Sequence, residues 1–589
     1  MKIIFNIRNT LNNAKKSFKR FPIAMIFSIL SAILLILGVK YESSKNFNGN
    51  FTRYGFLCFV AMLAFIFLGL FLEGLKNLAR NEEELQKYKL IKIAAYILSI
   101  PLLYGIKENI LNIEEKLFSF NNGYKFVGLV LFFIVASFYV SKIFYHKDYI
   151  AYVIKMMGAL FISMLYSVFL FLGIAAIFFA LVHLFGLNLS FNIYMYAAII
   201  VYIPFNAGIF LSNVPKSEEF LSNYELSKVT KVLLLYILMP LFSIYLIILY
   251  TYFAKILFIG ELPKNIITHL ILWFSLFSVV FIFALGMVKD SNAANEFRKI
   301  FPILMIPLIC FMFYSISIRV NEYGITENRY FVVAAGIWAL ASMIYYVFYR
   351  SNSNITVPII LSVIILISTI GPVSAYNISA TSQNYRLKQI LTKNNMLNGN
   401  QIIAKSDVSD SDKRRISEIV DYLNNKHRRY EQKYLPADFD FSDNAWKKTF
   451  GFNKKLFDED RNIYYSYNSQ IPVDIKGYSK LFVIDSFDET SDMVGNYKIK
   501  RKLDNINISY ISKNNEHSIV SINMTDLRNK LSVLKKSKEI IDAEDIAIKG
   551  NSGNIEYKIV FTNLNFYIDA EGNDYDYNCS FYLLTNEKK

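Results

Sequence analysis

Eleven long apolar runs occupy the first two thirds of the sequence, and they constrain the fold more than any other feature. A helix needs about 20 apolar residues to cross the hydrocarbon core of a bilayer, and each run is close to or above that length. We therefore predict an α-helical polytopic membrane domain of about eleven transmembrane helices within residues 21–376. The runs are residues 21–39, 54–75, 90–106, 124–144, 156–185, 191–213, 231–254, 266–288, 300–318, 330–349 and 355–376.

The first apolar run follows a basic segment, residues 1–20, whose last cations are Lys15, Lys16, Lys19 and Arg20. This order resembles the start of a secretory signal peptide. The run is too long for a signal peptide, however, and no small-residue cleavage site follows it. We predict that it is retained as the first membrane anchor, behind a cytoplasmic basic N-terminus.

The basic residues are distributed unequally between the two sets of alternating loops. With the N-terminus inside, the cytoplasmic segments and the adjoining run ends carry 21 Lys and Arg, whereas the opposite loops and their adjoining run ends carry 10. Cytoplasmic loops are normally the ones enriched in Lys and Arg. We therefore expect a bacterial plasma (inner) membrane protein with its N-terminus in the cytoplasm and its C-terminal domain outside. One span more or fewer would reverse the side of the C-terminal domain.

No run of comparable length occurs after residue 376, so a soluble domain should follow. We divide it into a helical part, residues 377–461, and a β-rich part, residues 462–589. In the first part, residues 386–391 form an amphipathic pattern. A second helix is predicted after Ser409-Asp410-Ser411-Asp412, because apolar residues recur there at helical spacing: Ile416, Ile419, Val420 and Leu423.

The second part of the tail alternates apolar and polar residues with a period of two, which is typical of strands. Strands are predicted around residues 480–487, 506–511 and 555–561, and a short helix near Thr525. The tail is thus predicted to be an α+β domain with its own core. Cys579 is its only cysteine, so an internal disulfide cannot stabilise it.

The formal charge of +16 is concentrated in the membrane part. Residues 1–376 carry +14 and the remainder carries +2. Cations beside membrane helices face anionic lipid, so we expect the lipid bilayer as a partner and no nucleic acid. The three cysteines and five histidines are scattered, and the acidic segment 569–576 does not match the spacing of a calcium loop. We predict a turn there, no metal and no cofactor.

Sequence motifs for enzymatic chemistry are missing from the chain. It has no Gly-x-Ser-x-Gly, no Gly-rich phosphate loop and no His-Glu-x-x-His. No catalytic residue is therefore predicted, and a non-enzymatic role is favoured. Among polar residues inside the runs, Asn206 follows Pro204. The pair could mark a broken helix, but an interhelical hydrogen bond of Asn206 is the favoured interpretation. Glu73 and Lys155 lie near run ends, from which they can reach water.

The loop between the ninth and tenth runs has the most specific sequence, RVNEYGITENRY, residues 319–330. Two interpretations are open. Its charges could pair with one another in a structural hairpin, with Gly324 allowing a sharp turn. Alternatively, the loop could bind a lipid headgroup or another ligand. The hairpin is favoured, and the candidate ligand residues are Arg319, Glu322, Tyr323, Glu327 and Arg329.

Three segments together resemble a bacterial family of multi-pass membrane proteins, the domain-of-unknown-function family 4153. They are RVNEYGITENRY, PLFSIYLIILYTYFAKILFIGELPKN and GPVSAYNISATSQNYRLKQILTKNNML. The resemblance implies a bacterial plasma membrane protein with a soluble tail, and it implies no catalytic residues.

Three functions fit this organisation. The favoured one is a non-enzymatic sensor, scaffold or assembly factor of the cell envelope, whose extracytoplasmic domain binds an envelope protein partner. A transporter or lipid flippase is the second, although no internal repeat is evident. The third is a membrane glycosyltransferase that acts on a lipid-linked sugar. Its chemistry needs acidic residues in the first outer loop, residues 40–53, where Glu42 stands alone.

Overall fold

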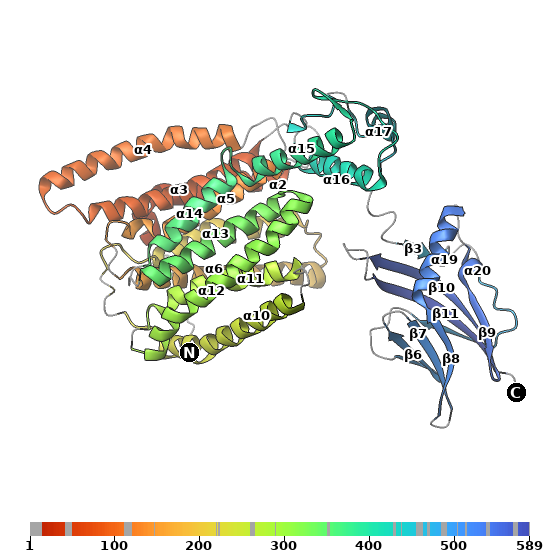
Figure 1. Cartoon of the computed structure of the whole chain (residues 1–589). Coiled ribbons are helices and arrows are strands. Elements are labelled where there is room, and N and C mark those ends of the chain that lie inside the picture. Colours follow the sequence, from red (N-terminus) through yellow and green to blue (C-terminus); the bar gives the residue numbers. More distant parts are fainter. Residues whose placement is uncertain are drawn as a thin grey trace. The chain divides into compact units, whose positions relative to one another are not determined.

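The computed structural model of the chain contains a bundle of apolar helices and a β-rich C-terminal domain (Figure 1). The structure describes residues 15–41, 50–110, 120–145, 148–219, 221, 224–259, 265–288, 290–349, 354–427, 431–436, 439–454, 463–467, 472–484, 492–502, 505–512, 515–537, 542–568 and 575–587. Most of the first outer loop, including Glu42, and most of the acidic segment 569–576 lie outside these ranges.

Within the described residues, ten helical segments are long and apolar enough to cross a membrane, and a shorter apolar helix follows them. The eleven segments match the eleven predicted runs one to one, which confirms the predicted polytopic helical domain. In chain order they are α2 (Pro22–Tyr41), α3 (Phe51–Lys76), α4 (Glu82–Ile110), α5 (Phe120–Ser137) with η1 (Val140–Lys142), α6 (Tyr149–Phe185), α7 (Asn192–Ile200) with η2 (Val201–Phe205) and α8 (Asn206–Asn213), α9 (Lys228–Val232) with η3 (Leu233–Leu238) and α10 (Met239–Ile259), α11 (Asn265–Leu285), α12 (Asn292–Tyr323), α13 (Glu327–Phe348) and α14 (Thr356–Thr369).

The last apolar run ends earlier than the sequence pattern suggested. α14 stops at Thr369, and a new helix, α15 (Ala375–Lys393), begins after a short turn. Gly371 adopts a positive φ of 97° in this turn, and Pro372 disfavours helical backbone at the residue before it. The 14 residues of α14 span about 21 Å at 1.5 Å per residue, so α14 is shorter than the other spans.

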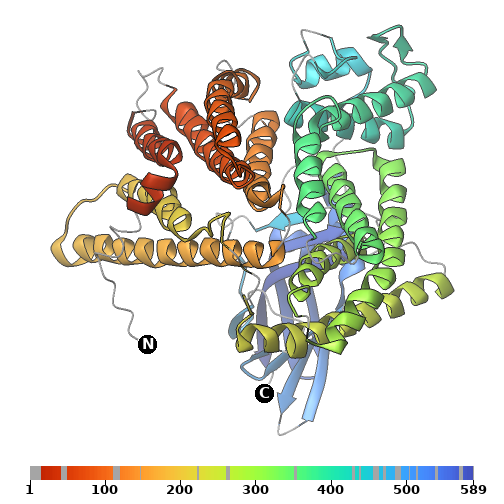
Figure 2. The ribbon, with the colours of Figure 1, turned by 90° about the vertical axis from the view of Figure 1, so that its left-hand side faces the viewer.

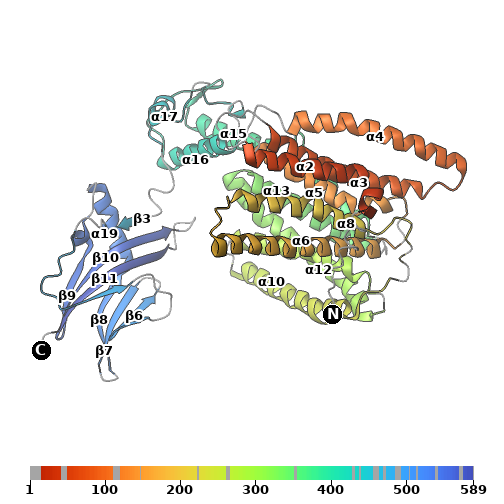
Figure 3. The ribbon, with the colours of Figure 1, turned by 180° about the vertical axis from the view of Figure 1, so that it is seen from behind.

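The sixth span contains a break, which was the less favoured interpretation of Pro204 and Asn206. Its centre, η2, is a π-helical turn that includes Pro204, which cannot donate a helical hydrogen bond. Asn206, the first residue after η2, donates from Nδ2 to Ser167 Oγ in α6 at 3.0 Å, which confirms the predicted interhelical bond. α6 and α8 lie side by side in this region (Figure 3).

The chain divides into two compact units. The first contains residues 1–393, 399–401 and 421–437, and thus all of the apolar helices together with α15. The second contains residues 394–398, 402–420 and 438–589. α16 (Asp410–Lys426) crosses this division. Ser409 Oγ accepts from the Asp412 backbone N–H at its start, and its four predicted apolar residues are buried.

The second unit is an α+β domain, as predicted, and its strands are coloured blue in Figure 2. One antiparallel sheet has the order β3-β10-β11-β4, with β9 also paired to β10, and the other has the order β5-β6-β7-β8. Side chains from both sheets and from α19 share one core. The elements are β1 (Leu397–Asn398), β2 (Gln401–Ile402), α17 (Asp443–Phe450), β3 (Ile463–Ser466), β4 (Lys480–Ile484), β5 (Asp492–Val494), β6 (Tyr497–Lys502), β7 (Asn505–Ser512), β8 (Asn515–Asn523), α19 (Met524–Ser537), α20 (Ala543–Ile546), β9 (Ile548–Ser552), β10 (Ile555–Ile568) and β11 (Tyr575–Glu587).

The predicted strands at 506–511 and 555–561 lie within β7 and β10, and residues 480–484 of the first predicted strand form β4. The short helix predicted near Thr525 is present as α19. α19 starts at Met524, and Asn523 caps it by accepting the Asp526 backbone N–H at 3.0 Å. Asn523 is therefore both the last residue of β8 and the N-cap of α19.

Candidate functional site

The loop between α12 and α13 is a tight reversal built on Gly324. α12 ends at Tyr323 and α13 begins at Glu327. Gly324 has a φ of 72°, a conformation that glycine adopts without strain. A Cβ at this position would lie 2.4 Å from Cδ of Arg386. The predicted sharp turn at Gly324 is therefore present, and it is packed closely against α15.

Two side chains of α15 satisfy the backbone of this loop. Gln383 Nε2 donates to the carbonyls of Tyr323 and Ile325 at 3.0 and 3.2 Å. The Arg386 guanidinium donates to the carbonyls of Glu322 and Tyr323 at 2.7 and 2.5 Å. The last carbonyls of a helix have no partner within it, so these contacts stabilise the C-terminal end of α12.

The candidate residues separate into two groups in the structure. Arg319, Glu322 and Tyr323 lie in the last turns of α12, and Arg329 lies in the first turn of α13. Arg329 donates to the Gly324 carbonyl at 2.9 Å, and its guanidinium lies 5.4 Å from the centre of the Tyr323 ring. Glu327, by contrast, is directed to a separate polar cluster. The contacts of Arg329 and Glu327 thus differ from the salt bridges expected within the loop.

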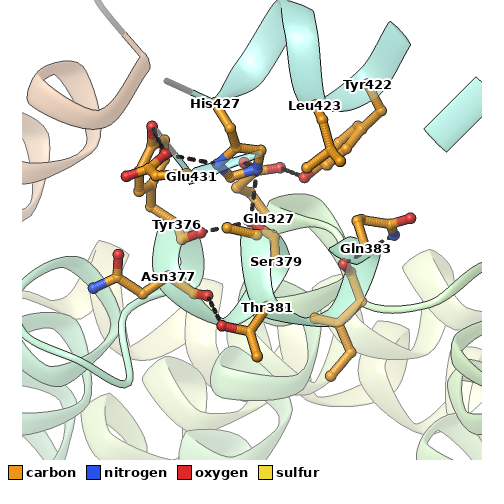
Figure 4. Close-up of polar contacts among 12 residues, drawn as sticks. Glu327, Tyr376, Asn377, Ser379, Thr381, Gln383, Tyr422, Leu423, His427 and Glu431 are labelled. Atoms are coloured by element: carbon orange, nitrogen blue, oxygen red, sulfur yellow. Dashed lines mark hydrogen bonds and ion pairs between the residues drawn. The ribbon is translucent and has the colours of Figure 1, made fainter. Parts of the chain in front are cut away.

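Glu327 and His427 form the centre of that cluster (Figure 4). His427 Nε2 lies 3.4 Å from Glu327 Oε1, and His427 Nδ1 lies 3.6 Å from Glu431 Oε2. The imidazole side chain is fully buried, and 4% of the Glu327 side chain is exposed. One imidazole therefore lies between two carboxylates, an arrangement in which a protonated ring can offset both charges.

Three hydroxyl groups complete the cluster. Tyr376 donates to Glu431 Oε2 at 2.6 Å, and Tyr422 donates to Glu327 Oε2. Ser379 Oγ lies 3.3 Å from His427 Nε2. Burial and the hydrogen bond to the Glu327 carboxylate raise the pKa of Tyr422, so this phenol stays protonated and remains a donor at any physiological pH.

The cluster can hold a proton and can connect three segments, but its centre is closed to ligands in this conformation. Its members come from the start of α13, from α15, and from α16 and the residues that follow it. Within the described ranges, no group of three or more His, Cys, Asp and Glu residues is arranged to hold a metal ion. The geometry is that of a buried ionic junction that fixes α15 and the end of α16 to the loop before α13.

Glu327 was among the residues predicted from the sequence, whereas its partners were not. Tyr422 and His427 lie in or at the end of the predicted second tail helix. The separation of four residues between His427 and Glu431 was a visible signal, although such pairs are common on solvated helices. Nothing in the sequence pointed from Glu327 to Tyr422, because the two are separated by 95 positions.

One protein-family model matches a range of the chain that includes the loop between α12 and α13 together with α13, α14 and α15. The family described as "Domain of unknown function (DUF4153)" matches residues 55–404, which is more than half of the chain. The chain belongs to the DUF4153 family. This confirms the resemblance that the three sequence segments indicated. The matched range of the DUF4153 protein includes Glu327, Tyr376 and Arg386, and it ends before His427 and the β-rich domain.

One curated relative of this DUF4153 protein is "Uncharacterized protein PM1469" from Pasteurella multocida (strain Pm70). The two are 23% identical over 332 residues, which cover 53% of this chain and 56% of the relative. The chain thus spans about half the length of the relative that it matches. No solved structure matches the chain. The comparisons therefore support a multi-pass membrane protein and assign no activity.

Proposed function

We propose that the chain is a plasma membrane protein of the bacterial cell envelope, with its N-terminus in the cytoplasm and its C-terminal domain outside. The unequal charge of the loops supports this orientation. Contacts of α15 with the loop before α13 support the number of spans, because the chain crosses through α13 and returns through α14 before it reaches α15. The loop and α15 then lie on one side of the membrane.

Reporter fusions test this orientation. Alkaline phosphatase fused after Lys393 should be active, since the enzyme folds only outside the cytoplasm, and a fusion after Arg80 should be inactive. The opposite pattern would place the C-terminal domain in the cytoplasm. Activity of both fusions would instead show an error in the span count.

In this location the chain acts as a non-enzymatic scaffold or sensor whose β-rich domain binds an envelope protein. The observation that carries this proposal is an exposed apolar end strand. β4 is the last strand in its sheet, and Leu481 and Val483 are 46% and 53% exposed. Their neighbours Phe482 and Ile484 turn toward the core. Exposed apolar strands at a sheet end are sites of strand addition by a partner.

A photo-crosslinking residue at Val483, in the full-length chain in cells, should give a covalent adduct of one defined mass. Met493 provides a matched control, because it is 54% exposed and lies on β5, the end strand of the other sheet. Val483→Lys should reproduce the phenotype of a strain that lacks the protein, without lowering the amount of protein. Met493→Lys should leave the wild-type phenotype unchanged. Equal adducts at both positions, or none, would contradict a partner surface at β4.

A transporter or flippase is the second candidate, and the interrupted spans favour it. π-helical turns occur at η2 (Val201–Phe205) in the sixth span and at η3 (Leu233–Leu238) in the seventh. Such turns are frequent at functional sites, and interrupted helices are common in transporters. Movement of a fluorescent lipid between the leaflets of reconstituted vesicles would support this candidate. An unchanged leaflet distribution would reject a flippase.

A further inference from the structure

A large basic cavity lies in the membrane unit, apart from the loop and the ionic junction. Its volume is about 1210 Å³. Four segments form it: residues 16–20 before α2, the end of α3, the first half of α6, and the residues around the end of α8. The segment before α2 precedes every span, and the end of α3, the start of α6 and the end of α8 follow two, four and six spans. All four therefore reach the same side of the membrane, the side with more Lys and Arg.

The charges of the cavity do not cancel. Six cations line it, Lys16, Lys19, Arg20, Lys76, Lys155 and Lys216, together with three carboxylates, Glu73, Glu218 and Glu219. Each carboxylate already has a basic partner. The pairs are Arg20–Glu73 at 2.7 Å, Lys155–Glu219 at 2.6 Å and Lys76–Glu218 at 3.7 Å.

Three lysines remain after this pairing. Lys16, Lys19 and Lys216 make no ion pair with any residue that the structure describes. The cavity therefore has a formal excess of three positive charges. An anion in the cavity would be attracted by all three lysines.

Arg20 gives the charged wall a fixed position. In addition to its two hydrogen bonds with Glu73, its guanidinium donates to the carbonyls of Val214 and Pro215 at 2.5 and 3.0 Å. These bonds join the segment before α2 to the end of α3 and to the chain after α8. The cavity is thus bounded by a connected polar frame, beside which the exposed side chains of Lys16, Lys19 and Lys216 lie.

The cavity also has an apolar wall, which comes mostly from α6. It consists of Ile154, Gly158, Ala159 and Ile162, together with Leu211 of α8. A Cβ built on Gly158 would meet no atom within 4 Å, so there is open space beside this residue. A ligand that contacts both the lysines and the apolar wall needs an anionic group and an apolar chain.

We propose that this cavity binds the phosphate of an anionic phospholipid, with the acyl chains against α6. Basic pockets between membrane helices on the cytoplasmic side bind such headgroups. A soluble phosphate would satisfy the same lysines, but it would leave the apolar wall at Gly158 unused. The lipid is therefore the source that the cavity favours.

The experiment uses the full chain, purified in an uncharged detergent, and titrates it with three probes while binding is followed by native mass spectrometry. The probes are dioctanoyl phosphatidylglycerol, dioctanoyl phosphatidylcholine and inorganic phosphate. Wild-type protein should bind phosphatidylglycerol saturably, and at least about tenfold more tightly than phosphatidylcholine. That ratio corresponds to about 1.4 kcal/mol.

Two independent variants should each weaken phosphatidylglycerol binding by about tenfold or more. The first, Lys16→Gln/Lys19→Gln/Lys216→Gln, removes the excess charge. The second, Gly158→Leu, fills the open space beside residue 158 and leaves every charge in place. Gly158→Leu should not harm the helix, since leucine is the better helix former.

Each variant has a matched control. Lys15→Gln/Lys89→Gln/Lys228→Gln makes the same change in net charge on the same side, at positions that do not line the cavity. Gly173→Leu makes the same substitution elsewhere in α6, where a Cβ also meets no atom within 4 Å. Both controls should bind phosphatidylglycerol like the wild type.

Equal affinity for both lipids would overturn the proposal, and so would equal loss of binding in variants and controls. Inorganic phosphate that binds as tightly as phosphatidylglycerol, and responds to the lysine variant but not to Gly158→Leu, would overturn the lipid assignment. Loss of phosphatidylglycerol binding in both variants and in neither control would support it.

Discussion

Glu327, in the first turn of α13, accepts a hydrogen bond from the hydroxyl of Tyr422 in α16. The carboxylate also lies beside the imidazole of His427. A residue next to the membrane-spanning helices is thereby joined to a helix that begins after α15. Because the Glu327 side chain is almost completely buried, its charge depends on these partners for stabilisation.

Tyr422→Phe should destabilise the full-length protein. The substitution keeps the ring and removes the donor to a buried carboxylate, which costs about 1–3 kcal/mol. Thermal unfolding of the purified protein in detergent measures the effect. Tyr385→Phe is a matched control on α15, because Tyr385 is 61% exposed, and it should be neutral.

Combining Tyr422→Phe with Glu327→Gln measures the interaction between these two residues separately from their contacts with other residues. Removal of the buried charge should make the loss of the phenol hydroxyl less harmful, so the double variant should be more stable than the sum of the two single effects implies. Additive effects would show that Tyr422 and Glu327 are not energetically coupled.

The second prediction concerns Arg329 and separates the two interpretations of the loop. If its charge pairs with Glu322, exchanging the two residues would restore stability lost in Arg329→Ala. The structure predicts no such rescue, because Arg329 donates to the backbone carbonyl of Gly324 and Arg386 holds the carbonyl of Glu322. A carboxylate at position 329 cannot donate to a carbonyl.

The stability of Arg329→Ala, Glu322→Arg and the exchanged double variant should be compared by thermal unfolding. We expect Arg329→Ala to lose about 1–2 kcal/mol, since one carbonyl of the loop loses a charged donor. Full recovery of the wild-type midpoint in the exchanged variant would restore the salt-bridge interpretation.

The third prediction concerns the pH dependence of the β-rich domain. Hydrogen bonds from Lys549 and Lys558 lower the pKa of Glu544 from its ordinary value of 4.5. Lys558 is buried in β10 and also donates to the Asp474 carbonyl at 2.9 Å. A carboxyl whose pKa is lower in the folded protein stabilises it above the unfolded pKa. This stabilisation is lost as the pH falls below about 4.5 through the folded value.

Hydrogen exchange of the β10 amides measures the local stability in the full chain. At neutral pH, Glu544→Gln should exchange faster than the wild type, because the buried ammonium of Lys558 loses its counter-charge. The difference should shrink as the pH falls below about 4. Lys549→Gln serves as the control and should have a smaller effect, since Lys549 is an exposed partner. A difference that is independent of pH would reject the role of Glu544 ionisation.

The membrane helices and most tail elements could be predicted from the sequence because local composition determines them. Apolar runs predict spans, and the recurrence of Ile416, Ile419 and Leu423 predicts α16. The early end of α14 had a signal as well, since the Gly371-Pro372 pair is a common helix stop. The partners of Glu327 could not be predicted from any comparable sequence signal. His427 and Tyr422 reach it through tertiary packing, and the cavity lysines come from segments up to 200 positions apart.

The last prediction concerns Cys579, the only cysteine of the tail. It lies in β11 opposite Leu564 of β10, and it is buried. Burial raises the pKa of its thiol to about 12, so only about one molecule in 10⁴ carries the reactive thiolate at pH 8. In a Cys58→Ala/Cys310→Ala background, maleimide should label the native protein at least about 100-fold more slowly than protein unfolded in guanidinium. Reductant should not change the unfolding midpoint of the domain, because its core forms without a disulfide. Rapid native labelling, or a dimer that disappears on reduction, would show that β11 opens or that Cys579 links two chains.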